Sequence, residues 1–365
     1  MTTPLEQLPF PEDLPGFGPP LMAHASAASA ALLAPLTAAE NVGAVLTTFT
    51  GATARAAVRR IRRVNAGASL LLDADRYSGQ NRSFGHQLSP EWIAFQHRLM
   101  LPWALTDSWY VAAGDVQSLR KLFRQAAGLG PRVILALPLA LSWLTSDIDI
   151  LLAEIDQARL PVGLMLEAER DPISEKGTVT GLLRVISTGV PVLVLRSDVA
   201  AIGSLAFGAA AAAIGTSSGR RHIYPVQPPR AEDAPPPPSH ISAVVPVLMA
   251  YKWLSVIERG TQHNPTLPLW LCECSTCLGQ SIDWIIRAND PSAAAFQHSI
   301  ASLAGTALTI LAPPTQGGRA SAWRQACAVA QVSHDQVERP SGTTWTPSDA
   351  LKRWQLETQP VPASR

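Results

Sequence analysis

Three of the chain's four cysteines lie within six positions, in the pattern Cys-x-Cys-x2-Cys. They are Cys272, Cys274 and Cys277, and His298 follows in a segment, 292–311, that we expect to be helical. Zinc prefers four tetrahedral nitrogen and sulfur ligands, and three thiolates with one imidazole make a closed structural site. The alternative is three reduced cysteines beside an ordinary helical histidine. Their clustering favours structural Zn²⁺ bound by these four residues.

Acidic side chains that follow apolar runs are the candidates for chemistry. Asp73 closes the run 69–72, and Glu167 ends a run with no other polar group. A carboxylate at a strand end can serve as a base or a nucleophile. The candidate catalytic residues are therefore Asp73, Glu167 and Asp198, and the candidate substrate-binding residues are Asp75, Arg76, Arg196, Ser217, Arg220 and Arg221.

Two of these carboxylates, Asp73 and Glu167, also have a purely structural interpretation. Asp73 could cap a helix or pair with Arg76 or Arg82, and Glu167 could pair with Arg196 on the next run. Arginine's planar fork binds phosphate or carboxylate groups through two hydrogen bonds, so a rim rich in both charges also suits a polar or anionic substrate. Both interpretations stay open at this point.

Residues 215–222, Gly-Thr-Ser-Ser-Gly-Arg-Arg-His, combine glycines, hydroxyls and cationic side chains directly after an apolar run. Small residues let backbone N–H groups approach an anion, while arginine supplies charge. We expect this loop to contact a phosphate, from a nucleotide or a nucleic-acid backbone. The alternative is a flexible loop with solvated cations.

The elements that must position these side chains are short, nearly continuous apolar runs that alternate with amphipathic segments. Such runs are typical of strands covered on both faces of a parallel sheet. Helices are expected near 53–64, 89–99, 115–127, 145–158 and 174–187, so each run and its helix have the size of a βα unit. The pattern predicts an α/β fold, a (β/α)8 TIM barrel with a small zinc-binding subdomain. The runs are 42–48, 69–73, 108–112, 133–137, 162–168, 192–195 and 210–214, with 267–271 as an eighth.

Proline-rich stretches suggest where the chain divides. We expect an N-terminal arm and helix at 1–39 and the barrel core at 40–261, with a proline-rich insertion at 225–238 and a helix at 241–260. The zinc subdomain and C-terminal helices then occupy 262–335, and 336–365 forms a C-terminal tail.

Composition excludes several classes of protein. Apolar residues make up 47% and charged residues 16%, which indicates a folded, core-rich chain. A net charge of +1 gives no argument from bulk charge for nucleic-acid binding, although a local basic patch is compatible with it. No stretch has the length of a membrane span, and the acidic, proline-rich start does not resemble a signal peptide, so we expect a cytoplasmic protein that does not engage membranes.

The cysteine pattern with a following helical histidine resembles the zinc subdomain of the queuine/archaeosine tRNA-guanine transglycosylases. Residues 214–221 are similar to that family's last-strand segment, Pro-Thr-Arg-Asn-x-Arg, and 69–73 resembles the strand before its Asp-Ser-Gly-Gly-Phe motif. The chain departs from the family at two places. Alanines occupy 210–213, where the family carries its nucleophilic aspartate, and 74–77 is Ala-Asp-Arg-Tyr.

The resemblance implies a transferase that exchanges purine or 7-deazapurine bases in tRNA or DNA. Such chemistry needs one carboxylate to attack the sugar and a second to move protons. Asp73 could fill one role, and Asp198, Asp75 or Glu167 the other. The alternative is a non-catalytic zinc-containing barrel that binds nucleic acid, a partner subunit or a second copy of itself as a homodimer. A barrel enzyme of unrelated chemistry that carries structural zinc is the third hypothesis.

Overall fold

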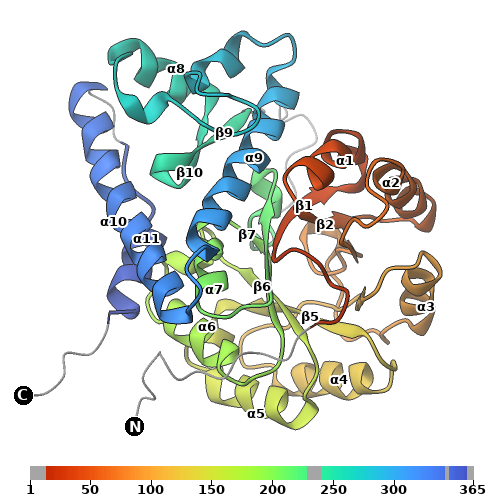
Figure 1. The fold of residues 1–365 in the computed structure, drawn as a ribbon. Helices are drawn as coiled ribbons and strands as arrows, with labels where there is room; N and C mark the ends of the chain where they lie inside the picture. The colour runs from red at the N-terminus through yellow and green to blue at the C-terminus, as the bar shows by residue number, and fades with distance from the viewer. Residues whose placement is uncertain (1–13, 228–239, 342–344, 360–365) are drawn as a thin grey trace, which may run out of the picture.

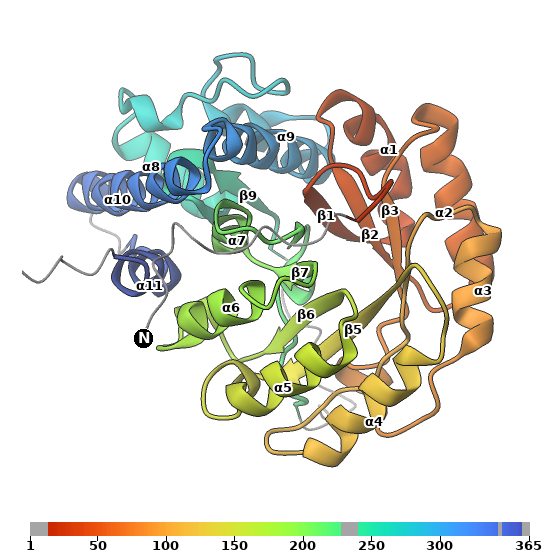
Figure 2. The same cartoon turned by 60° about the horizontal axis from the view of Figure 1, so that its bottom comes forward.

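The computed structural model describes residues 14–227, 240–341 and 345–359. Eight parallel strands form a nearly closed barrel in the order β3-β2-β1-β8-β7-β6-β5-β4, and β3 and β4 lie next to each other where the hydrogen-bonded ring opens. The ring of strands with helices outside it is seen in Figure 2. The expected (β/α)8 barrel is therefore confirmed. Its strands are β1 (Leu21–Ser26), β2 (Gly43–Thr47), β3 (Leu70–Asp73), β4 (Ala104–Leu105), β5 (Val133–Ala140), β6 (Val162–Glu167), β7 (Val192–Ser197) and β8 (Ala211–Gly215).

Helices connect the strands on the outside of the barrel (Figure 1). Side chains cap several of them where the sequence changes from loop to amphipathic repeat: Thr50, Ser89 and Asp115 each accept a hydrogen bond from a backbone N–H of the first turn. All five helices expected between the apolar runs are present. The barrel helices are α1 (Ala30–Ala39), α2 (Gly51–Val64), α3 (Pro90–Arg98), α4 (Val116–Ala127), α5 (Ile148–Ala158), α6 (Thr178–Ile186) and α7 (Ile202–Ala206).

The first strand of the barrel lies in the segment expected to be an arm and helix. β1 pairs in parallel with both β2 and β8 and thereby brings the ring together. Its apolar pattern is interrupted by His24, which is fully buried, and prolines precede it. A polar histidine interrupts the apolar run, so the sequence pattern does not indicate a strand here. The partners that satisfy this buried side chain lie far away in the sequence.

Two of the expected strands, 108–112 and 267–271, are wrong. The run 108–112 contributes a single bridge, between Val111 and Leu139, and the fourth strand lies earlier, at β4. The run 267–271 contains a 3₁₀ turn, Pro268–Trp270, because proline removes a ladder donor and fixes φ. The eighth strand is supplied instead by β1.

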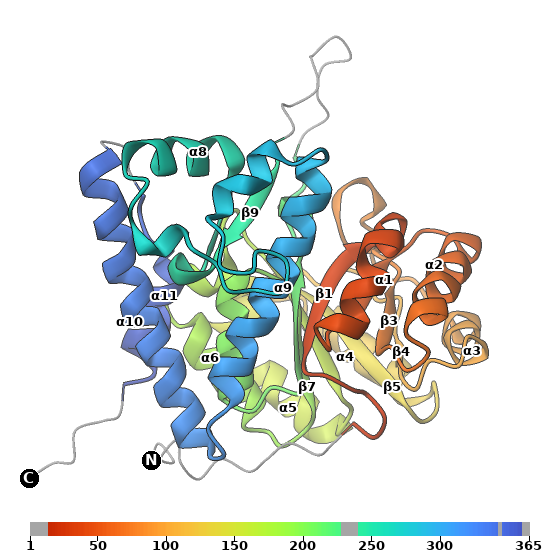
Figure 3. The same cartoon turned by 45° about the horizontal axis from the view of Figure 1, so that its top comes forward.

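A second, smaller unit packs beside the barrel and begins before residue 262. The expected helix at 241–260 is instead an antiparallel hairpin followed by a helix, because Pro246 interrupts the chain and Met249 turns it with φ +49°. Figure 3 shows α9 between this unit and β1. The elements are β9 (Ser242–Val245), β10 (Ala250–Trp253), α8 (Leu254–His263), α9 (Pro291–Leu311), α10 (Gln316–Ser341) and α11 (Asp349–Glu357).

The smaller unit has its own apolar core, built around Trp270, Cys277 and Trp345 and separate from the core of the barrel. α9 joins the two, since Ala294 and Ala295 belong to the small core whereas Ile300 belongs to the barrel core. Among the described residues, α9 is the helix long and apolar enough to cross a membrane, and it is mostly buried. In this structure α9 contributes side chains to both apolar cores.

The expected tail at 336–365 is partly helical and packed. α11 lies against α10, and Trp354 is fully buried. Large apolar side chains in this stretch therefore anchor it to the body of the protein. Most of the proline-rich insertion expected at 225–238, and the last residues of the tail, lie outside the described residues.

Candidate functional site

The barrel mouth, at the carboxyl ends of the strands, is centred on Asp73, which is 2% exposed. Its Oδ2 accepts hydrogen bonds from Tyr77 Oη at 2.7 Å and Thr47 Oγ1 at 3.3 Å, and His24 Nε2 lies 3.1 Å away. Its Oδ1 accepts from the backbone N–H of Asp75 at 2.9 Å. Both carboxylate oxygens of Asp73 are thus held by its own protein, Oδ2 by three partners and Oδ1 by one.

His24 is a buried neighbour of Asp73 that the sequence analysis did not identify. Its Nδ1 accepts a hydrogen bond from the backbone N–H of Arg196 at 3.0 Å, so Nε2 carries the ring hydrogen and donates a hydrogen bond to Asp73. Burial lowers the pKa of His24 despite the opposing effect of Asp73. The ring is accordingly neutral and fixed in one tautomer.

The same hydrogen bond helps to hold the carboxylate of Asp73 charged. Burial alone would raise the pKa of Asp73, but the hydrogen bond from His24, together with the charge of Arg196, brings it below its usual value.

Arg196 fills the centre of the mouth. It forms an ion pair with Asp75 at 2.7 Å, and both side chains are almost fully buried. The rest of its guanidinium is also used, because the other N–H groups reach Tyr77 Oη, Ser78 Oγ and the carbonyls of Gly219 and His222. All five donors of this arginine therefore have protein partners.

Backbone strain marks the same ion pair. Arg196 has φ +48° and Asp75 has φ +49°, in the left-handed region that side chains other than glycine adopt at a cost. The pairing of β7 with β8 also shifts register between Val194 and Ser197, which turns Arg196 out of the ladder. Such strain persists only where surrounding contacts over-determine it. The side chains around Asp73 and Arg196 thus form a polar cluster whose members satisfy one another.

The remaining rim residues divide between several places. Glu167 lies with Arg82 and accepts from Tyr110 Oη at 2.5 Å, so the considered pairing of Glu167 with Arg196 is wrong. Arg76 is exposed and contributes no side-chain contact to the cluster around Asp73. The partners of Glu167 are distant in the sequence, so neighbouring residues do not reveal them.

Asp198 caps a short 3₁₀ turn by accepting from the N–H of Val199 at 2.7 Å. Its charge, added to burial, raises the pKa of Asp171 to about 7. The sequence analysis did not select Asp171, which resembles an exposed loop charge in the segment Glu-Arg-Asp-Pro. Asp171 and Asp198 therefore lie close to each other at the edge of the mouth.

The loop after β8 separates its two arginines. Arg220 lies toward the mouth, where burial and the charge of Arg196 lower its pKa. Arg221 lies on the other side, with its guanidinium 3.4 Å from the centre of the Tyr251 ring. The loop folds back so tightly on Gly215 that a Cβ there would meet the carbonyl oxygen of Arg220 at 2.1 Å. Glycine at this position is therefore required by close backbone approach.

The metal-ligand candidates come together as the sequence predicts. Ligand atoms of Cys272, Cys274, Cys277 and His298 all lie within 4.8 Å of one another. His298 Nδ1 is 3.9, 3.6 and 3.1 Å from the three sulfurs in that order, close to the roughly 3.5 Å that separates ligands around a tetrahedral zinc. These four groups can hold a metal ion.

Second contacts fix the orientation of this cluster. His298 Nε2 lies 2.7 Å from the carbonyl oxygen of Val244, which leaves Nδ1 facing the thiols. Trp284 Nε1 donates to Cys277 Sγ at 3.2 Å. Cys327 lies apart, buried in the barrel core. Val244 pairs with Tyr251 in the hairpin, and Arg221 lies over the ring of Tyr251. The metal cluster is therefore connected to Arg221 through the hairpin.

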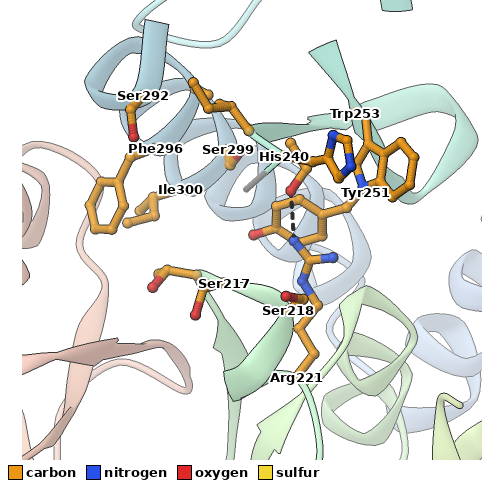
Figure 4. A pocket seen from close by; sticks show the side chains of 14 residues that line it. Ser217, Ser218, Arg221, His240, Tyr251, Trp253, Ser292, Phe296, Ser299 and Ile300 are labelled. Carbon is orange, nitrogen blue, oxygen red and sulfur yellow. Dashed lines mark hydrogen bonds between the residues drawn. The ribbon is translucent and has the colours of Figure 1, made fainter. Parts of the chain in front are cut away.

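A cleft of about 460 Å³ opens beside the mouth, between the β8 loop, the β9–β10 hairpin and α9 (Figure 4). Ser217 and Arg221 line it, whereas Arg196, Asp73 and Asp75 do not. The sequence analysis missed the opposite walls, because their residues are distant in sequence from the loop. Those walls include His240, Tyr251, Trp253, Ser292, Phe296 and Ser299.

Comparison with known proteins adds little to this geometry. No family model and no curated protein matches the chain. Among solved structures, a mandelate racemase/muconate lactonizing protein from Herpetosiphon aurantiacus is similar at a TM-score of 0.34 and 13% identity, over 58% of each chain. The match thus spans less than two thirds of that protein's length. The fold assignment rests on the strand order of the chain itself.

Proposed function

We propose that this protein is a zinc-containing, transglycosylase-like barrel that binds nucleic acid and does not exchange bases itself. The observation that carries the proposal is the contrast around β8. Buried Ala211, Ala212 and Ala213 occupy the strand where the resembled family carries its nucleophile, while the loop that follows presents Arg221 to an open cleft. An alanine methyl group cannot attack an anomeric carbon.

The carboxylates at the mouth support the non-catalytic alternative. Asp73 accepts four hydrogen bonds from its own protein, Asp75 is paired with Arg196, and Glu167 is held by Arg82 and Tyr110. A nucleophile needs a lone pair directed at its substrate. Attack by any of these groups would compete with the contacts that orient it within the protein.

A basic helix supports nucleic acid as the partner. α2 contains five arginines and no acidic residue, and its apolar positions face the barrel. Arg62 donates to the carbonyl of Met100 at 2.8 Å, while Arg55, Arg59, Arg60 and Arg63 are exposed. Clustered exposed arginines attract phosphates even where the whole chain is nearly neutral.

The metal in the cysteine–histidine cluster is, on this proposal, zinc. Three thiolates and one imidazole leave no open coordination position, which is typical of structural zinc. Protein purified without chelators should contain about one zinc per chain by elemental analysis, and Cys277→Ser should lose it. Cys327→Ala, which removes the buried thiol outside the cluster, is the matched control and should keep it.

Two assays on the same preparation test the function. Labelled guanine or 7-deazaguanine is incubated with tRNA or DNA, and we expect no incorporation. A gel shift with tRNA and with single-stranded DNA over a salt series should give complexes whose affinity falls as salt rises, because phosphate contacts release counterions.

Incorporation of label that disappears in Asp73→Asn would overturn the non-catalytic assignment and restore Asp73 as a catalytic residue. Absence of any salt-dependent complex would overturn nucleic acid as the partner.

A further inference from the structure

A cationic side chain lines the cleft beside the mouth. Among the residues that the structure describes, the lining includes the guanidinium of Arg221 and no carboxylate. The Arg221 guanidinium donates from Nη2 to Ser242 Oγ at 3.1 Å and lies over Tyr251, while its buried Nε has no hydrogen-bond partner. These contacts hold the group in place and leave donors unused. The site therefore favours an anion.

Hydroxyl groups surround this cation. Ser217, Ser218 and Ser292 are exposed and line the cleft from the β8 loop and from α9. Ser299 differs, because its Oγ already accepts from the backbone N–H of Val244 at 3.1 Å. Ser217 Oγ accepts from Arg220 Nη1 at 3.2 Å, and a hydroxyl that accepts one hydrogen bond can still donate another. A planar guanidinium beside several exposed hydroxyls suits the oxygens of a phosphate.

An aromatic surface forms the outer wall. The rings of Trp253 and His240 stack at 4.0 Å with an interplanar angle of 15°, and Trp253 stays 50% exposed. Figure 4 shows this pair on one side of the cleft and Phe296 on the other. A half-exposed indole already ordered by a stacking partner presents a flat face at little entropic cost. Such a face binds a planar ring.

We propose that this cleft binds one nucleotide of a single strand, with its phosphate at Arg221 and the serine hydroxyls and its base against the Trp253–His240 stack. The volume of about 460 Å³ is in the range of small-molecule sites. The choice of a nucleic-acid strand over a free nucleotide rests on the proposed function, since both carry a phosphate and a base. It places recognition outside the barrel mouth.

Fluorescence anisotropy with a labelled six-nucleotide single strand measures strand binding at the site. Calorimetry with guanosine monophosphate and with inorganic phosphate measures whether a free nucleotide or phosphate alone also binds. We expect Trp253→Ala to weaken strand binding about tenfold or more, because a stacked base is lost. Arg221→Gln should reduce the salt dependence by about one phosphate contact, and Arg221→Lys should retain it.

The matched control for the aromatic change is Phe84→Ala, which removes a ring that is 67% exposed and lies outside the cleft lining. It should bind as the wild type does. Melting temperatures of all variants, measured in parallel, separate a binding defect from a folding defect.

Strand binding that is equal in wild type, Trp253→Ala and Arg221→Gln would overturn the cleft and leave the proposed function standing. Mononucleotide binding as tight as strand binding, and lost in Trp253→Ala, would overturn the single strand as the source. Mononucleotide binding without any nucleic-acid complex would overturn the proposed function while supporting the cleft.

Discussion

The barrel mouth and the cleft beside it are built from the same kinds of side chain, and they differ in how those side chains are occupied. In the mouth, the guanidinium of Arg196 uses all its donors on protein atoms, and Asp73 accepts from four partners. In the cleft, Arg221 is held by one hydroxyl and one ring and keeps donors free. Occupancy rather than residue type thus distinguishes a structural cluster from a binding site.

The comparison also separates the two adjacent arginines of one loop. Arg220 lies toward the closed mouth and Arg221 toward the open cleft, although they are neighbours in the chain. The backbone turn at Gly215 imposes this division. Adjacent residues of one loop can therefore face two different regions of the molecule.

The largest expected effect comes from the metal cluster, which lies behind the cleft wall and away from the mouth. Cys277→Ser should lower the melting temperature by on the order of 10 °C, because structural zinc contributes folding energy directly and Cys277 also belongs to the small core. Strand binding should be lost with it, since His298 holds Val244 of the hairpin. Calorimetry and anisotropy measure the two effects.

The control is again Cys327→Ala, which should melt closer to the wild type and keep strand binding. If Cys277→Ser melted and bound like the wild type, the cluster would have no part in forming the cleft.

The next effect tests the mouth as a structural element. Asp73→Asn replaces a carboxylate that accepts four hydrogen bonds with an amide that cannot accept them all, so the free energy of unfolding should fall by roughly 3 kcal/mol. Denaturant titration measures the loss. Strand binding by the folded variant should be unchanged, because Asp73 does not line the cleft.

An Asp73→Asn protein that is as stable as the wild type but binds the strand more weakly would contradict this comparison. It would give the mouth, rather than the cleft, the binding role.

The smallest effect concerns pH. Burial lowers the pKa of His24, so the unfolded chain binds a proton at this residue more readily than the folded one does. Stability should therefore decrease as pH falls below ~6.5, the ordinary value for histidine. Asp73, whose pKa lies below its usual value, adds a further loss only at more acidic pH. Denaturant titrations at pH 7.5, 6.5 and 5.5 measure the decrease.

His24→Gln should be less stable at pH 7.5 and should lose part of this pH dependence. The matched variant His263→Gln, at an exposed position of α8, should keep the wild-type profile. Identical profiles for wild type and His24→Gln would show that the buried ring does not titrate between the two states.

The amino-acid sequence by itself determined the barrel and the metal cluster. Runs such as 133–137 and 162–166 are apolar on both faces, which is typical of parallel strands covered on both sides, and amphipathic segments of helical period separate them. The three cysteines lie on one short turn, so their proximity follows from chain length alone. His298 was found because thiolates need a fourth ligand and the following helix offers one.

Only the tertiary structure decided which polar side chains meet. His24 joins Asp73 across 49 positions, Arg196 chooses Asp75 rather than Glu167, and the cleft unites Arg221 with Trp253. Partner choice depends on strand register, on the bulge in β7 and on the position of α9 against the barrel. These are properties of packing between distant segments, and local patterns of residues do not encode them one by one.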